Sequence, residues 1–522
     1  MRITNKIMQR NNLSNINTNK VYQDKLSTQM STQKKVNRPS DDPVVAIRAL
    51  RLRSNVSEVT QYYSKNIPDA ESWLSVTEDA LKNLTSIVTN MISQCTKGSN
   101  GDLKSSDREI ILEQLKALGE EVYSTGDADY AGRYVFTGYR TDTSLSFTEE
   151  QTLPYEITEQ LDSSSIDMLT KVNTDQLLNI NSANYNTIDV DDTKISAVDV
   201  YRIRLAYNDC TDGASPSISF GKKVDAAGNI TFDTTWSVGS GEITQMHSYE
   251  DPYSEIAKPG NEDKIIYVPE TGELLLGKNK YNELMAVRDD VSTAAVNEGE
   301  IKVTYQKEHW TKGDLRPEHY FYCKSNPGDA AKEITYNNDY LKGDPEKQVI
   351  EYDVGFNQTI RVNSTADECF QHGIGREVDD LVDAMQNVLD LEAVQSEIKK
   401  LQETATGADA EKLQTQMDAV EKALTLAKDK CQKMFEGAIT SFQGYLDDAN
   451  MCITNCGTRS SKLELIENRM QNQKTTFETL KSENEDVDIT EVAIQLSSAE
   501  LTYEAALMAT GKVMQTTLLN FI

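Results

Sequence analysis

The end of the chain, from Asp488 to Ile522, carries a long apolar stripe. Its apolar positions advance by alternating steps of four and three residues, which is the spacing of a coiled-coil seam. Asp488 precedes the stripe as a candidate N-cap, and Glu491 can complete a capping box. An uninterrupted helix of this length reaches about 50 Å and would expose its stripe to water, so the pattern predicts a partner helix. The stripe comprises Val492, Leu496, Ala499, Tyr503, Ala506, Thr510 and Val513.

The other end of the chain offers that partner. A sparse apolar stripe runs through the first helical stretch, and residues 1–53 carry a net charge of +8, whereas residues 464–522 carry −6. Opposite charges favour pairing, either antiparallel within one chain or between copies. Frayed, solvated termini are the alternative, and the coiled-coil spacing favours pairing. The predicted assembly interface is Ile3, Ile7, Leu496, Ala499, Tyr503, Ala506, Val513, Leu518 and Phe521.

Four more stretches predict long amphipathic helices with the same alternating spacing, and short turns between such helices favour antiparallel neighbours in a bundle. Ser40 or Asp41 can cap the first of them, and Pro43 suits its first turn. Pro68 is predicted to end this helix, and Gly98 to end the next. The four stretches are residues 45–63, 73–91, 111–122 and 431–480.

The middle of the chain has a different pattern. Residues 147–369 contain short strand-like runs bounded by turn residues, which predicts a β-rich inserted domain. Residues 377–430 read as a helical hairpin broken near residues 404–408. The predicted fold class is therefore α+β: a long antiparallel α-helical bundle or coiled coil formed by the N- and C-terminal regions, with a β-rich central inserted domain. The predicted segments are residues 1–42, 43–147, 148–375, 376–430, 431–484 and 485–522.

Composition narrows the functional classes. A net charge of −30 argues against general nucleic-acid binding, because a phosphate backbone demands a basic surface. Neither an apolar signal-peptide core nor a run of transmembrane length is visible, so composition alone predicts a cytoplasmic protein without membrane insertion. The seven cysteines are odd in number and scattered, which predicts mostly free thiols. Cys452 and Cys456 could form half of a metal site, but their spacing fits core positions first.

No catalytic constellation is apparent. The four histidines fall in no metal-binding spacing, and the common nucleophile and phosphate-binding motifs are missing. The neighbouring carboxylates Asp41 and Asp42 are interpreted as helix-capping residues. We therefore predict no enzymatic activity, no metal and no cofactor, with an enzyme or a glycan-binding module in the β-rich domain as the alternative.

Two motifs near the N-terminal end are specific: RPSDDP at residues 38–43 and GRYVFTGYRT at residues 132–141. They resemble segments of the bacterial flagellin-like axial proteins, and within them of the hook-associated protein 3 branch, in which RPSDDP is similar to the start of the first long helix. The motif GRYVFTGYRT at residues 132–141 is the most specific match, and residues 485–488 and 518–522 resemble the terminal helix of the family. The resemblance covers roughly residues 1–147 and 430–522.

This resemblance implies a structural protein of the bacterial flagellum that connects hook to filament. It implies an extracellular location, reached by type III export without a cleaved signal peptide, and terminal helices that are loose in the monomer and polymerise on assembly. The implied partners are further copies in a ring, the neighbouring hook-associated junction protein, flagellin and an export chaperone. A filament-forming flagellin is the main alternative within the family, and a cytoplasmic coiled-coil scaffold is the alternative outside it.

Overall fold

The structure is a computed structural model that describes residues 5–161, 165–174, 176–213, 216–224, 230–288, 301–341 and 348–519. The chain forms two compact units, each built from segments that are distant in sequence. Unit 1 contains residues 1–71, 352–360 and 461–522, and unit 2 contains residues 72–351 and 361–460.

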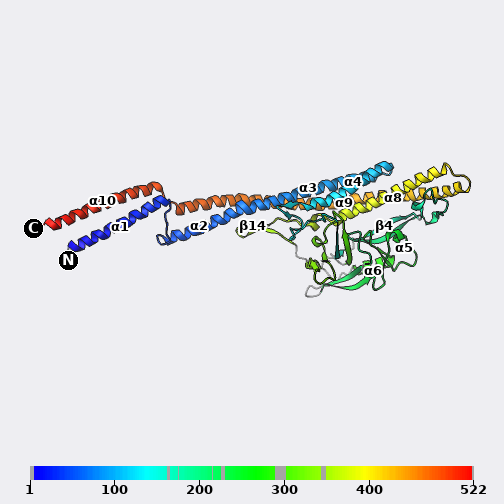
Figure 1. The fold of residues 1–522 in the computed structure, drawn as a ribbon, viewed down its shortest axis with the longest axis horizontal. Coiled ribbons are helices and arrows are strands. Elements are labelled where there is room, and N and C mark those ends of the chain that lie inside the picture. Colours follow the sequence, from blue (N-terminus) through cyan, green and yellow to red (C-terminus); the bar gives the residue numbers. More distant parts are fainter. Residues whose placement is uncertain are drawn as a thin grey trace. The chain divides into compact units, whose positions relative to one another are not determined.

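Long helices form both ends of the chain (Figure 1). They confirm the helical stretches expected from the apolar spacing. The N-terminal helices are α1 (Asn5–Thr32), α2 (Pro43–Gln61), α3 (Ile67–Gly98) and α4 (Ser105–Ser124). The C-terminal helices are α8 (His372–Gln402), α9 (Ala408–Glu485) and α10 (Ile489–Leu519).

Two aspartates start helices of unit 1. The Asp42 carboxylate accepts hydrogen bonds from the backbone N–H groups of Val44 and Val45, and Pro43 occupies the first turn of α2. The expected cap at Ser40 or Asp41 is therefore wrong, since Asp41 instead accepts from the N–H of Arg38 in the preceding turn, whereas the interpretation of Asp42 as a capping residue is confirmed. The position of Asp488 as the cap of α10 is confirmed by its bonds from the N–H groups of Thr490 and Glu491.

The expectation that Pro68 ends a helix is wrong. A π-helical turn, η1 (Tyr62–Asn66), joins α2 to α3, so that the helical path continues through the proline. In this turn the N–H of Ile67 donates to the carbonyl of Tyr62, five residues earlier. The wider turn moves the preceding carbonyls away from the pyrrolidine ring, which removes the clash that makes proline a helix breaker.

Unit 2 contains a bundle built from α3, α4, α8 and the first part of α9. Its core side chains include Trp73, Leu84 and Phe442, all buried. At Gly98 a Cβ atom would lie 2.5 Å from the ring of Phe435, so the close approach of α3 to α9 requires glycine there. Gly98 also ends α3, as expected.

The bundle also contains the predicted helical hairpin, which is confirmed. Helices α8 and α9 are separated by residues 403–407, where Gly407 has a φ of 66°. Helix α9 then continues to Glu485 without a break at residue 430, because its apolar spacing is maintained throughout. The division of the chain into six segments stays a prediction. No helix in the described ranges is long and apolar enough to cross a membrane.

Two larger sheets form most of the β-rich part of unit 2 in the described residues, so the predicted α+β class is confirmed. The larger has the strand order β13-β12-β3-β11-β6-β7, and the smaller has the order β4-β5-β10-β9-β8, in which only the β8–β9 pair is parallel. The larger sheet comprises β3 (Gln151–Leu161), β6 (Ser217–Val224), β7 (Ile230–Ser237), β11 (Ile301–Trp310), β12 (Tyr322–Ser325) and β13 (Ile334–Tyr336). The smaller comprises β4 (Ile166–Asn173), β5 (Ser196–Arg204), β8 (Ile243–Gln245), β9 (Ile265–Val268) and β10 (Glu273–Leu276).

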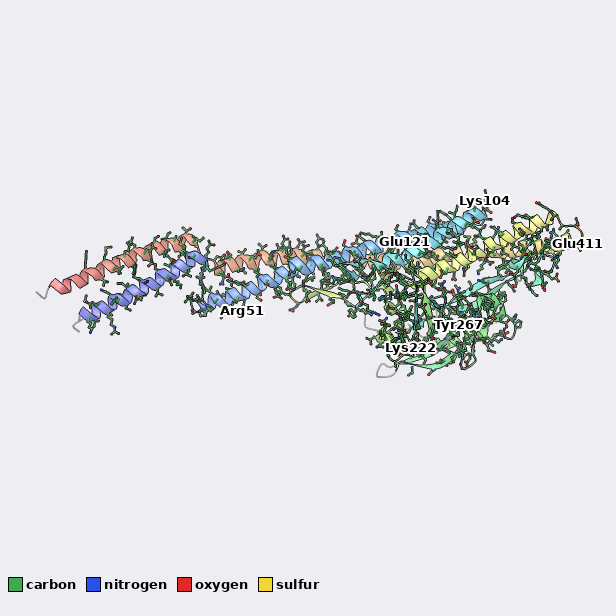
Figure 2. All side chains as sticks on the ribbon, viewed as in Figure 1. Arg51, Lys104, Glu121, Lys222, Tyr267 and Glu411 are labelled. Atoms are coloured by element: carbon green, nitrogen blue, oxygen red, sulfur yellow. The ribbon has the colours of Figure 1, made fainter. Side chains whose placement is uncertain are left out.

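The smaller sheet has a buried apolar core. Tyr267, labelled in Figure 2, belongs to β9 of this sheet and is fully buried. The smaller sheet carries an apolar cluster that includes Leu169, Val200 and Leu275, against which Met434 of α9 packs. The short elements are the hairpins β1 (Asp129–Tyr130) with β2 (Arg133–Tyr134) and β14 (Glu351–Gly355) with β15 (Gln358–Arg361), and the helices α5 (Pro252–Ile256), α6 (Lys278–Arg288) and α7 (Ala366–Cys369).

Candidate assembly surface

Helices α1 and α10 lie side by side at the two ends of the chain (Figure 1). They run antiparallel, because a backbone bridge joins Lys34 to Asp486 at the base of the pair while Tyr22 reaches Gln495 further along. Leu26 of α1 packs with Val492 and Ala499 of α10 in a small buried cluster. The expected pairing of the chain ends is therefore realised within one chain.

The predicted interface residues divide into three groups. Ala499 is buried against α1, and Leu496, Tyr503 and Ala506 are half-buried on the same face of α10. Ile7 is exposed. Leu496 and Ala499 therefore serve pairing inside the chain, and the role of the predicted positions between copies stays a prediction. Ile3, Phe521 and the side chains of Val513 and Leu518 lie outside the described residues.

A second seam on α10 was missed by the sequence analysis. Ile494, Leu501 and Met508 recur every seven residues and have exposed fractions of 67%, 73% and 67%. Ser498 and Ala505 fall between them, so the steps again alternate between four and three. At about 100° per residue, Ile494 lies about 200° around the helix from Val492. This outer seam, defined as these five residues, therefore faces away from α1.

The spacing of the outer seam was visible in the sequence. Two of its five positions are the small residues Ser498 and Ala505, so its apolar signal is weaker than that of the inner stripe. Only the packing of α1 on the opposite face shows which stripe is used within the chain.

Other apolar side chains of unit 1 are also uncovered. An accumulation of exposed large apolar residues along neighbouring helices is uncommon in a soluble monomer and marks an interaction surface. On α1 these residues are Ile7, Met8, Leu13, Val21, Tyr22 and Met30, and on α2 they are Val44, Ile47 and Leu50.

Charge pairs hold the region where α1 ends and α10 begins. The Arg53 guanidinium donates two hydrogen bonds to the buried Glu485 carboxylate, at 2.6 and 2.8 Å, and these lower the pKa of Glu485. Lys34 pairs with Asp486 and lowers the pKa of that carboxyl in the same way. Because α1 ends and α10 begins beside these pairs, the α1–α10 helix pair has a defined base.

The cysteines and histidines considered for metal binding or catalysis contact backbone carbonyls or are buried. Cys456 donates to the carbonyl of Leu74, and Cys452 donates to that of Glu368, so the two thiols of the i, i+4 pair have different surroundings. His319 contacts the carbonyl of Ser144, and burial lowers its pKa to about 4. Burial likewise lowers the pKa of His372 to about 3. Within the described parts of the chain, no group of three or more metal-ligating side chains comes together.

The small core between α1 and α10 predicts early proteolysis of both ends. Only a few buried side chains hold this pair, in contrast to the large core of unit 2, and termini with few buried contacts open readily. Limited trypsin digestion followed by mass spectrometry should trim roughly the first 40 and last 35 residues before cutting elsewhere. Ends as resistant as the bundle would contradict this expectation.

The N-terminal part of the chain is similar to known flagellar proteins. Residues 3–141 match the model of the bacterial flagellin N-terminal helical region. The chain is 31% identical over 152 residues to flagellar hook-associated protein 3 of Escherichia coli strain K12, covering 29% of this chain and 47% of the relative. It is 27% identical over 122 residues to a flagellin of Clostridium tyrobutyricum, covering 23% of this chain and 32% of the relative.

A solved structure adds a broad but weak likeness. A putative flagellar hook-associated protein from Vibrio parahaemolyticus aligns with 85% of this chain and 100% of its own, at 13% identity and a TM-score of 0.34. The chain spans about half the length of the first of the sequence relatives. The resemblance inferred from the sequence motifs is confirmed: residues 3–141 match the bacterial flagellin N-terminal helical region, and the chain is similar to flagellar hook-associated protein 3.

Proposed function

We propose that this protein is a structural component of the bacterial flagellum that connects the hook to the filament. In this role it polymerises through its terminal helices and performs no catalysis. The flagellin-type N-terminal region and the similarity to hook-associated protein 3 support the proposal. The observation that carries it is the outer seam on α10, which repeats a coiled-coil pattern on a face that no described helix of its unit covers.

The two seams of α10 would allow copies of this protein to assemble into a ring or tube. The inner seam packs on α1 of the same chain, while the outer seam, with Ile494, Leu501 and Met508, stays open to a helix of a second copy. A helix with apolar stripes on opposite faces can contact two neighbours at once, as a closed wall of subunits requires. Removing these side chains from water would drive association.

The further partners follow from the family resemblance. The ring would contact the neighbouring hook-associated junction protein on one side and flagellin on the other. Before assembly, an export chaperone would cover the apolar C-terminal helix. The protein would leave the cell by type III export without a cleaved signal peptide and act outside it.

A filament-forming flagellin is the second candidate. The similarity to a flagellin of Clostridium tyrobutyricum favours it, and the same two-seam helix would serve a long filament as well as a short ring. The two candidates differ in copy number and position along the flagellum.

Immunogold labelling of intact cells separates the candidates. We expect a single band of label at the junction of hook and filament. Label along the whole filament would favour the flagellin, and a flagellum without label would contradict both. A strain lacking the gene, complemented with the full chain, provides the control for antibody specificity.

A further inference from the structure

The structure places two cysteines together that are 83 positions apart in the sequence. Cys369 ends the short helix α7, and Cys452 lies on the long helix α9, both within unit 2. Cys452 Sγ lies 3.3 Å from the carbonyl oxygen of Glu368, the residue next to Cys369. Cys369 Sγ in turn lies 3.5 Å from the carbonyl oxygen of Thr365, so both thiols lie at the contact between α7 and α9.

Neighbouring interactions hold α7 against α9. Thr365 and Glu368 form a capping box at the start of α7, and Arg361 pairs with Glu368 at 3.1 Å. Arg459, two helical turns beyond Cys452, donates a 2.8 Å hydrogen bond to the carbonyl of Asn363. The approach of Cys369 to Cys452 is therefore fixed by the surrounding fold.

The two sulfurs differ in their readiness to react. Cys452 keeps 7% of its surface exposed, whereas Cys369 keeps 1%. The neighbouring Cys369 lowers the pKa of Cys452, while the neighbouring Cys452 and burial raise the pKa of Cys369. Because the thiolate is the nucleophile in disulfide exchange, Cys452 is the group that attacks first.

We propose that Cys369 and Cys452 form a disulfide within the folded chain when it meets a small-molecule disulfide such as oxidised glutathione. The Cys452 thiolate attacks one sulfur of the oxidant, forms a mixed disulfide and releases one glutathione. The Cys369 thiolate then attacks the Cys452 sulfur of the mixed disulfide and releases the second glutathione. Two protein thiols and one oxidant disulfide become one protein disulfide and two glutathione thiols, which take up the two protons.

The cross-link would join the segment returning from the β-rich region to the long helix of the bundle. It closes a large loop, and disulfides that close large loops restrict the unfolded chain strongly. We therefore expect the melting temperature of unit 2 to rise by about 5 °C or more on oxidation. This inference does not rest on the proposed function, because the geometry belongs to the folded chain alone.

Thiol counting and peptide mapping on the purified full chain test the proposal. After incubation with oxidised glutathione and removal of the excess, the denatured protein should show five free thiols in place of seven. Non-reducing digestion should yield one peptide pair linking Cys369 to Cys452. Seven remaining thiols, or a cross-link between other cysteines, would overturn the proposal.

Serine variants provide the controls. Cys452→Ser and Cys369→Ser should each prevent both the cross-link and the rise in melting temperature, while their reduced forms should have wild-type circular dichroism. Cys456→Ser is the matched control, because Cys456 lies one turn further on the same helix and its thiol bonds to Leu74 instead. It should still form the cross-link. A cross-link that persists in Cys452→Ser, or fails in a folded Cys456→Ser, would contradict the assignment.

Discussion

Replacing Ile494 and Leu501 together with aspartate should abolish assembly while leaving the isolated chain as stable as the wild type. Both side chains are exposed, so the charges stay hydrated in the monomer. Between copies they would be buried without partners, which costs several kcal/mol. Cells producing the variant should release flagellin into the medium and carry few attached filaments. Circular dichroism and thermal melting of the purified chain should be unchanged.

Two further variants show whether the outer seam is responsible. Thr502→Asp adds the same charge next to Leu501, at a position that is exposed but about 100° further around the helix, and filaments should attach normally. Leu496→Asp, on the inner seam, should loosen the α1–α10 pair and increase the proteolysis of both ends. Normal filaments with the double variant would mean that copies associate through another surface, and the proposed role of the outer seam would be wrong.

The long helices could be predicted because the residues that determine each of them lie close together in the sequence. Apolar spacing in steps of four and three located the long helices, and Gly98 and Asp488 marked ends that the structure confirms. The error at Pro68 has a local cause too, since a π-helical turn relieves the clash of proline and leaves no apolar signature in the sequence. Asp42 rather than Asp41 caps α2 because capping depends on backbone angles, which residue type alone does not determine.

The sequence pattern alone could not show which seam of α10 packs on α1. Either stripe of α10 fits a coiled coil, and only the contact with Leu26 shows that the inner one is used within the chain. The Cys369–Cys452 contact and the order of the strands have the same origin, because they depend on the pairing of segments separated by many residues. Sequence spacing suggested Cys456 as the neighbour of Cys452, whereas the fold brings Cys452 to the carbonyl of Glu368, next to Cys369.

The charged cluster around Arg202 is another feature that only the fold reveals. Arg202 of β5 has a side chain that is 4% exposed, and it pairs with Asp167 at 2.9 Å, with Glu273, and with Asp380 of α8 at 2.6 Å. Burial by itself would raise the pKa of Asp380, but the guanidinium groups of Arg202 and Arg204 outweigh it and lower that pKa to about 2. The cluster therefore ties the smaller sheet to the bundle within unit 2.

Replacing Arg202 with methionine should destabilise unit 2 by about 3–5 kcal/mol at neutral pH, because it leaves the Glu273 and Asp380 carboxylates buried without their shared cation. In the wild type, the contribution of Asp380 is present above its ordinary pKa of 3.8 and is lost as the pH falls towards about 2. In the variant Asp380 keeps Arg204 but loses Arg202, so burial raises its pKa above the wild-type value and it binds a proton more readily in the folded state. The loss of stability caused by Arg202→Met should therefore become smaller as the pH is lowered towards about 4.

Urea unfolding followed by tryptophan fluorescence measures this effect, since Trp73, Trp236 and Trp310 all belong to unit 2. The matched control is Lys82→Met, which breaks an exposed helical ion pair with Glu78 and should leave the free energy of unfolding nearly unchanged at either pH. Arg202→Lys should lie between the two, because lysine keeps the charge but loses the planar fork that reaches three carboxylates. A defect in Arg202→Met that is small, or equal at both pH values, would show that the carboxylates are solvated and that the cluster does not hold the sheet to the bundle.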